Sequence, residues 1–388
     1  MGADAALIDA WYRTNPARRR DGRQATMTDI TGPPSAAQPL FIMAMDQRDS
    51  FGSLFGVQDD QPAEDQLAAM REAKMLIFAA ARRVLSDTPL VAGRLGILVD
   101  EQLGADVARA AQEAGFVLAM PVEKSGSKEF KFEYGDQFAE HIEAFDPDWV
   151  KVLVRFNPED PAELREAQTA RLKRLNDYAS HSRRNWMLEL LVPPTSQQSD
   201  KYEDSSLYDE LARPGLTVRV VEALTAAGVH PGIWKLEGYE SADSARQVLA
   251  AVRAAGPPES SCIVLGRNAP QRQVDHWLTV AAPLEGYVGF AVGRSNWRQP
   301  LVDYLAGKAD REQTETRIAR HYRHFVHTYL QADNDPDEAE FARRPRLTPD
   351  REAVIRTATA GADPRETRLP AWMAQSLLAE VDALRQNS

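Results

Sequence analysis

Short apolar segments alternate with helical segments eight times between residues 40 and 305 of the chain. Runs rich in Val, Ile, Leu and Phe predict buried parallel strands, and the segments between them have the apolar spacing of amphipathic helices. The predicted strands are residues 40–46, 95–101, 116–123, 149–156, 186–192, 232–237, 262–267 and 287–294. Eight strand–helix units over this length predict an α/β fold of the (β/α)8 TIM-barrel type, which typically takes about 250 residues.

Helical patterns fill the gaps between these strands. They cover residues 64–85, 105–114, 136–145, 161–181, 206–227, 241–254, 270–281 and 297–305. Gly115, Gly228 and Gly256 come just after three of them, as expected where a helix ends. A doubly wound sheet is the alternative, but no glycine-rich dinucleotide turn follows the first strand. The repeat therefore favours closure into a barrel.

The charge balance of the chain is acidic, with 46 Lys and Arg against 57 Asp and Glu and a net charge of −11. This balance argues against nucleic acid or an anionic membrane as a partner and favours a small molecule. One cysteine, Cys262, excludes an intramolecular disulfide and suits a reducing cytoplasm. No apolar run reaches the roughly 18 residues of a transmembrane helix. We expect a cytoplasmic protein; a homo-oligomer is left open.

The two ends of the chain differ from this repeating middle. Residues 1–38 contain a basic cluster and a loop-like stretch, and we expect a flexible N-terminal extension there. The residues before Met27 are interpreted as upstream sequence; an Arg-rich targeting leader is the alternative, against which Asp4 and Asp9 argue. We expect the barrel to span residues 39–332. Residues 333–388 are predicted to form a linker and a helical extension, with the helix at 369–384.

Charged and polar side chains recur where the predicted strands end. They are Asp46, Gln47 and Arg48, Asp100 and Glu101, Glu123 and Lys124, Lys151 and Arg155, Glu189, Lys235 and Glu237, Arg267, and Arg294. Barrel enzymes build their active sites at the carboxyl ends of the strands. One such residue alone would be read as a solvated edge or a buried ion pair. Their recurrence around eight strands favours a functional site.

The sharpest signal comes from Lys151, Glu189 and Lys235. Each lysine lies inside an otherwise apolar strand, and the carboxylate is on the strand between them. Burial and a nearby second cation lower the pKa of a lysine, and a neutral amine can form a Schiff base with a carbonyl. Glu189 would then transfer protons, while Asp46 and Lys151 would orient or polarise substrate oxygens. The alternative is a buried Lys–Glu–Lys network that only stabilises the barrel interior.

The segment Gly289-Phe290-Ala291-Val292-Gly293-Arg294-Ser295 closes the last predicted strand. Loops after strands seven and eight frequently bind phosphate in barrels, through backbone N–H groups and a helix N-terminus. Arg294 would add a bidentate donor, and Arg267 a second one. A tight turn with a solvated arginine is the alternative interpretation.

Metal chemistry is not predicted. None of the seven histidines lies at a strand end, and His321, His324 and His327 are interpreted as one packed or solvated face of a late helix. Asp100, Glu101 and Glu123 together are a weaker candidate for magnesium. The chain also has no P-loop motif. We therefore expect no metal and no cofactor.

Five motifs together resemble a bacterial barrel domain of the class I aldolase group. They are Ala44-Met45-Asp46-Gln47-Arg48, Met120-Pro121-Val122-Glu123-Lys124-Ser125-Gly126, Val150-Lys151-Val152-Leu153-Val154-Arg155, Leu188-Glu189-Leu190-Leu191 and Gly289-Phe290-Ala291-Val292-Gly293-Arg294. That domain is best known fused to 5-dehydro-2-deoxygluconokinase in inositol catabolism, and it is similar to tagatose-1,6-bisphosphate aldolase. The resemblance covers residues 40 to 305.

The resemblance implies that Lys235 is the Schiff-base lysine, with Lys151, Glu189 and Asp46 as catalytic partners and Arg294 as a phosphate ligand. Gly293, Arg155, Arg267, Gln47, Arg48, Glu123 and Lys124 are the further candidates for binding substrate. The implied reaction is cleavage of a phosphorylated keto-sugar or keto-sugar acid, such as 2-deoxy-5-keto-gluconate 6-phosphate, to dihydroxyacetone phosphate and an aldehyde. Another Schiff-base lyase, a transaldolase-like enzyme and a non-catalytic sugar-phosphate-binding barrel are the alternatives. A polar loop over residues 192–204 could change the substrate.

Overall fold

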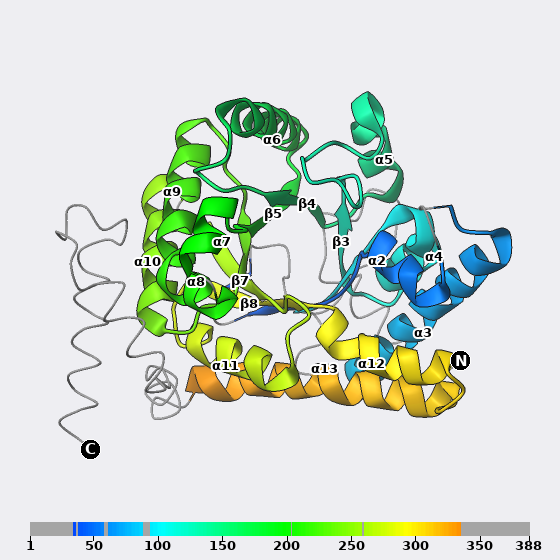
Figure 1. Ribbon diagram of the computed structural model, residues 1–388. Helices are drawn as coiled ribbons and strands as arrows, with labels where there is room; N and C mark the ends of the chain where they lie inside the picture. The colour runs from blue at the N-terminus through cyan, green and yellow to red at the C-terminus, as the bar shows by residue number, and fades with distance from the viewer. Residues whose placement is uncertain are drawn as a thin grey trace, which may run out of the picture.

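The computed structural model describes residues 34–334 apart from positions 36–37, 58–60, 88–93, 203 and 258–259. Its centre is a closed parallel barrel in which each strand pairs with the next and the last pairs with the first (Figure 1). The strands are β1 (Leu40–Met45), β2 (Leu95–Val99), β3 (Val117–Pro121), β4 (Trp149–Arg155), β5 (Asn185–Leu191), β6 (Ile233–Glu237), β7 (Ser261–Leu265) and β8 (Tyr287–Val292). The predicted (β/α)8 barrel is confirmed, and all eight predicted strands are present.

The strands divide the apolar residues into two cores. Side chains alternate between the two faces of a strand, so Leu40, Ile42 and Ala44 point into the barrel while Phe41 and Met43 face the helices. The same alternation applies to the charged residues at the strand ends. Lys151 therefore shares the inner face of β4 with Trp149, which belongs to the inner core.

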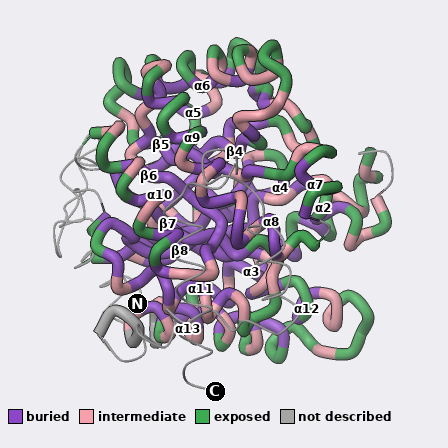
Figure 2. The backbone as a smooth tube through the Cα atoms, turned by 60° about the vertical axis from the view of Figure 1, so that its left-hand side comes forward, coloured by how far each residue is buried: buried purple, intermediate pink, exposed green. Residues whose placement is uncertain are grey.

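Helices surround the barrel and bury its outer face (Figure 2). The main ones are α3 (Glu64–Asp87), α4 (Glu101–Glu113), α5 (Phe138–Phe145), α6 (Ala162–Ser182), α9 (Arg213–Ala226), α10 (Ala242–Ala255), α11 (Gln271–Ala281) and α12 (Arg294–Leu305). A further long helix, α13 (Arg311–Asn334), packs against α3, α11 and α12 along the lower edge of Figure 1. Tyr322 of α13 donates a hydrogen bond from its hydroxyl to the Phe41 carbonyl at 2.6 Å, which fixes this helix to β1.

Several predicted boundaries differ from the structure, among them the strand predicted to end at 101, where α4 already begins, and two of the differences have local sequence causes. The segment expected as one helix over residues 206–227 is divided into α8 (Ser205–Leu211) and α9, which has Pro214 in its first turn. Proline has no N–H to donate to a preceding turn, so it favours a new helix start. The polar loop expected after β5 contains the helix α7 (Ser196–Tyr202). Thr195 and Gln198 cap it reciprocally, at 2.9 and 3.3 Å.

Short elements complete the described chain: α2 (Asp49–Gly52) with the 3-10 turn η2 (Ser53–Phe55) after β1, and the turn η4 (Gly135–Gln137) before α5. Residues 333 and 334, predicted as the start of a linker, are the last turn of α13. The predicted helix at 369–384 and nearly all of the predicted N-terminal extension lie outside the described residues. Within the described part of the chain, no helix has the length and apolarity needed to cross a membrane.

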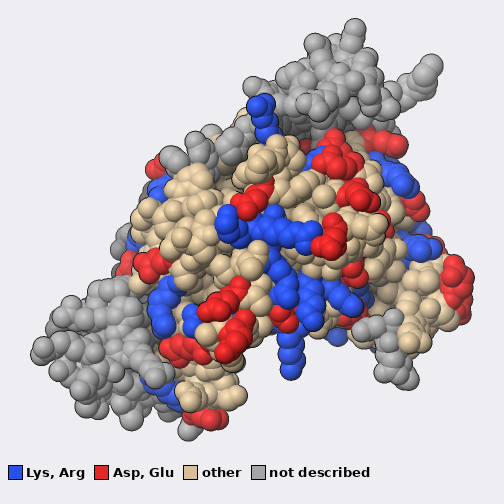
Figure 3. Space-filling view, turned by 90° about the horizontal axis from the view of Figure 1, so that it is seen from above, with Lys and Arg blue, Asp and Glu red and all other residues tan. Residues whose placement is uncertain are grey.

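The side of the barrel covered by α6 carries many charges of both signs (Figure 3). Basic residues of α6 pair with carboxylates of neighbouring segments, as in Arg171–Glu129 at 2.5 Å and Arg174–Asp136 at 2.7 Å. Arg184, just after the helix, pairs with Glu143 of α5 at 2.6 Å. These three basic side chains are therefore matched locally by carboxylates.

Candidate active site

A cavity of about 320 Å³ opens at the carboxyl ends of the strands. It is lined by residues of β1 and of β4 to β8, together with loop residues that follow β1, β3, β7 and β8. All of the predicted catalytic and substrate-binding residues line it, whereas the strand-end residues Asp100, Glu101 and Glu237 do not: the lining includes Lys235, Glu189, Lys151, Asp46, Arg294, Gly293, Arg155, Arg267, Gln47, Arg48, Glu123 and Lys124. The fold thus brings together side chains that are up to 248 positions apart in the chain, Asp46 and Arg294 being the farthest pair.

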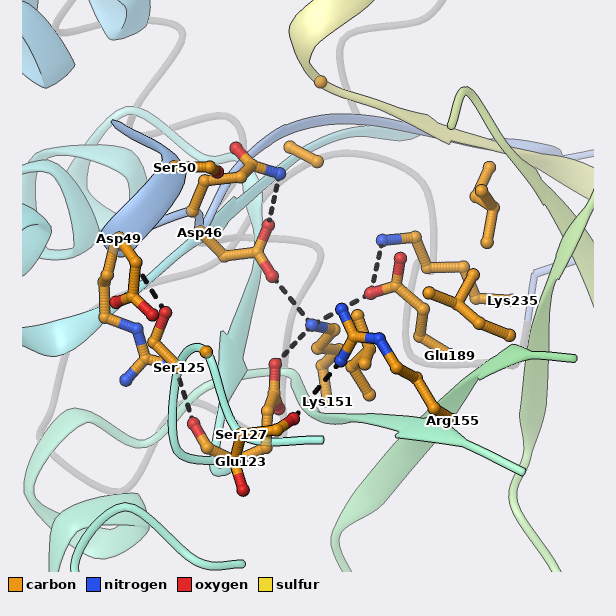
Figure 4. Close-up of a pocket in the computed structure, with 18 of the residues that line it drawn as sticks. Asp46, Asp49, Ser50, Glu123, Ser125, Ser127, Lys151, Arg155, Glu189 and Lys235 are labelled. Atoms are coloured by element: carbon orange, nitrogen blue, oxygen red, sulfur yellow. Dashed lines mark hydrogen bonds and ion pairs between the residues drawn. The ribbon is translucent and has the colours of Figure 1, made fainter. Parts of the chain in front are cut away.

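Lys151 lies among three carboxylates that come from three different strand ends (Figure 4). Its Nζ atom is 2.8 Å from Asp46 Oδ2, 2.5 Å from Glu123 Oε1 and 2.9 Å from Glu189 Oε2. The side chain is only 1% exposed. All three ammonium donors of Lys151 can therefore be satisfied by carboxylate oxygens.

Lys235 has a much simpler environment. Its Nζ atom contacts one carboxylate, at 2.9 Å from the same Glu189 Oε2 that contacts Lys151. Glu189 and Lys235 are direct partners in the pairing of β5 with β6, which places their side chains beside each other on the inner face of the barrel. Glu189 thus bridges two lysines that differ in the number of their carboxylate partners.

These contacts shift the pKa values of the four buried groups in different directions. Burial opposes the charge on Lys151, but Asp46, Glu123 and Glu189 outweigh it and raise the pKa of this lysine well above its usual value. Burial would likewise raise the pKa values of Asp46 and Glu189, but Lys151 and Lys235 lower both of them. Asp46 and Glu189 are therefore anions beside a firmly protonated Lys151.

Glu123 differs from the other two carboxylates. Burial raises its pKa, and the attraction of Lys151 does not reverse that shift, partly because Asp46 repels a second negative charge. Its Oε2 atom is buried and has no hydrogen-bond partner. An unsatisfied buried oxygen destabilises the charged form of a carboxyl group. Among the three carboxylates of the cluster, Glu123 is therefore the one that holds a proton most readily.

Arg48 and Lys74 support the ends of β1 and β3. Arg48 donates to the Glu123 carbonyl at 2.6 Å and pairs with Glu133 at 2.7 Å, so its guanidinium supports the loop after β3. The buried Lys74 of α3 donates to the Gln47 carbonyl at 3.1 Å and pairs with Asp100. Neither Lys74 nor Glu133 could be predicted from the sequence as part of the site, because Lys74 lies in a helix and Glu133 in a loop, away from any strand end.

Arg294 lies on the β8 side of the cavity, in the first turn of α12 after Gly293. It is half-buried, and no hydrogen bond or ion pair to another described residue holds its guanidinium. A Cβ atom at position 293 would collide with the Ala44 carbonyl, so glycine lets the start of α12 approach β1. Ser295 donates to the Ala269 carbonyl at 2.7 Å, which ties the helix start to the loop after β7.

The other basic residues of the cavity have partners or exposed positions. Arg267 pairs with Asp209 of α8 at 2.5 Å and with Glu237 of β6 at 3.1 Å, and its φ of +49° is unusual for a residue other than glycine. Arg155 donates weakly to the Ser127 carbonyl at 3.4 Å. Lys124 is exposed at the rim. Only Arg267 among these is held in place by ion pairs.

The fold gives separate partners to Asp100, Glu101 and Glu123, the residues of the weaker magnesium candidate. Asp100 caps α4 through the Leu103 N–H at 2.8 Å, and Glu101 pairs with His141 at 2.8 Å, whereas Glu123 faces Lys151. His321 and His324 of α13 contact the Asn296 carbonyl and Asp275. Over the described ranges, no group of three or more His, Cys, Asp or Glu side chains is arranged to hold a metal ion.

Residues 9–333 match the family described as "Uncharacterized protein conserved in bacteria (DUF2090)". The chain belongs to this family. A comparison with curated proteins finds no sequence match. The family of this DUF2090 chain is shown by its sequence match. The Lys–Glu–Lys arrangement is shown by the contacts of its own side chains.

Solved structures that are similar to this DUF2090 chain have low sequence identity to it. A fructose-bisphosphate aldolase from Plasmodium falciparum is 14% identical with a TM-score of 0.49, over 79% of this chain and 93% of that one. A Schiff base forming fructose-1,6-bisphosphate aldolase is 11% identical with a TM-score of 0.45, over 75% and 95%. An archaeal fructose 1,6-bisphosphate aldolase is 12% identical with a TM-score of 0.45, over 74% and 94%. Similarity at this level does not bear on the reaction.

Proposed function

We propose that this protein is a class I aldolase in which Lys235 forms a Schiff base with the carbonyl of a phosphorylated keto-sugar or keto-sugar acid. The observation that carries the proposal is the unequal environment of two buried lysines in one cavity. Lys151 contacts three carboxylates and Lys235 contacts one. A barrel interior held together only by ion pairs would not require a second lysine beside a cavity of about 320 Å³.

Lys235 is the proposed nucleophile because an amine must be neutral to attack a carbonyl. The three carboxylates around Lys151 raise its pKa and keep it an ammonium ion. That positive charge is close to Lys235, since both amines contact the same Glu189 oxygen. Lys151 is therefore proposed to act as a fixed positive charge beside the nucleophile.

Glu189 is the proposed proton-transfer group for forming the imine. Its Oε2 atom is 2.9 Å from the Lys235 amine. When the amine adds to the carbonyl, Glu189 takes a proton from nitrogen and gives one to the oxygen, which later leaves as water. The lowered pKa of Glu189 makes it an anion at rest, ready to accept that proton.

The protonated imine then serves as the electron sink for cleavage of the carbon–carbon bond. As that bond breaks, its electrons move to the iminium and give an enamine, while the hydroxyl on the neighbouring fragment loses its proton and becomes an aldehyde. Asp46 and Lys151 are proposed to orient and polarise the substrate oxygens during this step. The proton lost by that hydroxyl is balanced by a proton added to the enamine carbon, which regenerates the iminium, and hydrolysis of the iminium would release dihydroxyacetone phosphate.

The phosphate is proposed to bind at Gly293 and Arg294. Arg294 has no ion-pair partner among the described residues, and the first turn of α12 presents backbone N–H groups beside it. Arg155, Arg267 and Lys124 supply further positive charge around the cavity. A sugar phosphate that also carries a carboxylate suits this distribution, and 2-deoxy-5-keto-gluconate 6-phosphate is the first compound to test. We propose residues 39–332 as the catalytic unit, acting in the cytoplasm.

Borohydride reduction tests the proposal directly. The protein is mixed with the candidate ketose phosphates, reduced with sodium borohydride and examined by intact mass and peptide mapping. We expect a covalent adduct on Lys235 and release of dihydroxyacetone phosphate in unreduced samples. An adduct without carbon–carbon cleavage would indicate another Schiff-base enzyme. Transfer of a three-carbon unit from one sugar to another would indicate a transaldolase-like enzyme. Binding without any adduct would leave a sugar-phosphate-binding barrel and reject the aldolase.

Activity is expected to be independent of added metal. In this mechanism the lysine imine stabilises the developing carbanion, a role that a metal ion would otherwise perform. Exhaustive dialysis against EDTA should leave turnover within experimental error of untreated enzyme. Loss of turnover with rescue by a divalent cation would contradict the proposed mechanism. The carboxylates around Lys151 would then be the first residues to test as metal ligands.

A further inference from the structure

Lys235 must lose a proton before its amine can attack the substrate carbonyl, so another group must accept that proton. An unbroken line of contacts leads away from the amine. It runs from Lys235 Nζ to Glu189 Oε2 at 2.9 Å, from there to Lys151 Nζ at 2.9 Å, and on to Glu123 Oε1 at 2.5 Å. Each contact joins a proton donor to an acceptor, and each is short enough for a hydrogen bond.

We infer that Glu123 stores the proton that Lys235 gives up, and that Glu189 and Lys151 pass it between them. This inference rests on the proposed Schiff-base function and adds a proton-transfer residue to it. The sequence placed Glu123 among the substrate-binding candidates and in the weaker magnesium candidate. Its position at the far end of the line, three strands away from Lys235, gives it a different task.

The transfer balances at every atom. Lys235 gives a proton to Glu189, Lys151 gives one of its protons to Glu123, and Lys151 is restored by the proton from Glu189. Lys235 ends as a neutral amine and Glu123 as a carboxylic acid, while Glu189 and Lys151 return to their starting forms. After the amine has added to the carbonyl, the proton returns along the same line to the leaving hydroxyl. Water departs, the iminium forms and Glu123 is again a carboxylate.

The charge of the cluster favours this route over loss of the proton to solvent. With every group ionised, the site has the carboxylates Asp46, Glu123 and Glu189 and two ammonium groups. Moving one proton from Lys235 to Glu123 removes one charge of each sign, so the net charge does not change. Loss of the same proton to solvent would leave an additional uncompensated negative charge in a site whose members are nine-tenths buried. Burying unpaired charge is unfavourable.

Glu123 is suited to the task by its surroundings. Its Oε2 atom is buried without a partner, which disfavours the carboxylate, whereas Oε1 remains on the Lys151 ammonium. The groups that face it are Lys151 from β4, Asp46 from β1 and Arg48 just after β1, and Arg48 is itself paired with Glu133. Burial and the repulsion of Asp46 raise the pKa of Glu123, in the direction that a proton store requires.

The pH dependence of imine formation separates this inference from a merely structural role. In the wild-type protein, once Glu123 can ionise, the fraction of neutral Lys235 is set by an internal transfer and does not depend on pH. In Glu123→Gln that proton must leave to solvent, so the rate of adduct formation should rise about tenfold per pH unit across the range where the wild type is flat. Glu101→Gln is the matched control, because Glu101 pairs with His141 outside the cavity.

Infrared spectroscopy gives a second measurement that needs no substrate. Wild type and Glu101→Gln should show the C=O stretch of a protonated carboxyl group at pH values where an ordinary glutamate, with a pKa of about 4.3, is ionised. Glu123→Gln should lack that band while keeping the same thermal unfolding and far-ultraviolet circular dichroism.

The two measurements also distinguish this inference from the proposed function. Identical pH profiles for wild type and Glu123→Gln, or a carboxylic acid band that persists in this variant, would overturn the proton store and leave the Schiff base intact. No adduct on wild-type Lys235 would instead reject the proposed function. In that case the infrared band alone would decide whether Glu123 holds a proton.

Discussion

On the β4–β6 side of the cavity, Lys151, Glu189 and Lys235 contact one another directly, whereas on the β8 side Arg294 has no ion-pair partner among the described residues. Both sides are built from residues that follow or end barrel strands. They differ in how their charge is satisfied within the protein. On the first side, each of these charged side chains contacts an oppositely charged group before any ligand binds. On the second side, Arg294 has no such contact among the described residues.

This difference separates two tasks of one site. Groups that must act at defined positions benefit from being held there before the substrate binds, because their orientation then costs nothing during the reaction. A cation that waits for a partner instead contributes to binding when an anion arrives and neutralises it. We therefore expect changes on the β4–β6 side to affect the chemical step and changes at Arg294 to affect affinity.

The largest effect is expected from Lys235→Met. Methionine retains the apolar stem of the side chain but has no amine, so borohydride trapping and turnover should both be lost. Thermal unfolding and far-ultraviolet circular dichroism should remain close to those of the wild type. Lys173→Met is the control, since Lys173 is a half-exposed residue of α6 paired with Asp177. An adduct that maps to Lys151 would reverse the assignment of the two lysines.

Glu189→Gln should have the next largest effect. The amide preserves size and packing but cannot accept a proton from Lys235. A positioned proton-transfer group typically contributes about 10²–10⁴-fold, so kcat should fall within that range while KM changes much less. The measurement is steady-state turnover of the phosphorylated substrate, with Glu143→Gln on α5 as a surface control. Turnover close to that of the wild type would transfer the role to Asp46 or another carboxylate.

Arg294→Ala should act on binding and leave the chemical step nearly unchanged. Charge-assisted hydrogen bonds contribute roughly 1.5–3 kcal/mol, which corresponds to an increase of about tenfold to a hundredfold in KM for the phosphorylated substrate. The dephosphorylated analogue should be affected far less. Arg294→Lys keeps the charge but loses the planar guanidinium, so it should recover only part of the affinity. Equal effects on both substrates would mean that Arg294 only holds its loop.

The barrel could be predicted from the sequence because its signal is local and repeated. Each strand is a short apolar run such as Ile233–Glu237, and the helix between two strands separates these runs regularly. The residues at the strand ends could be found for the same reason, since a lysine or carboxylate in an apolar run is conspicuous. The pairing of β5 with β6 then places Glu189 directly beside Lys235, whereas Lys151 pairs with Met187, one inward-facing position before Glu189.

The individual partners within the cavity could not be predicted in this way. Strand order places the strand of Lys151 beside the strand of Glu189, but only the packed structure shows that Lys151 contacts Asp46, Glu123 and Glu189 while Lys235 contacts a single carboxylate. The support from Lys74 comes from a helix whose register the sequence does not specify. The partner of Arg267 is similarly hidden, because Asp209 lies on α8, in a segment expected to belong to one longer helix.

Arg267 therefore offers the finest test of the difference between paired and unpaired cations. Its guanidinium is already engaged by Asp209 at 2.5 Å and by Glu237 at 3.1 Å, so a substrate anion would have to share its charge with two carboxylates. We expect Arg267→Ala to raise KM for the phosphorylated substrate by less than about threefold. Because the side chain is 37% exposed, loss of its ion pairs should lower the free energy of unfolding only slightly, by about 1 kcal/mol or less.

Measuring KM and urea unfolding for Arg267→Ala beside Arg294→Ala separates the two arginines. Arg294→Ala should raise KM without changing the free energy of unfolding. Arg267→Ala should mainly lower the free energy of unfolding, by a small amount, and change KM little. If Arg267→Ala instead raises KM as much as Arg294→Ala does, the ion pairs with α8 and β6 orient Arg267 toward the substrate. The difference between the two sides of the cavity would then depend on where each cation points, since pairing alone would not predict which arginine binds the anion.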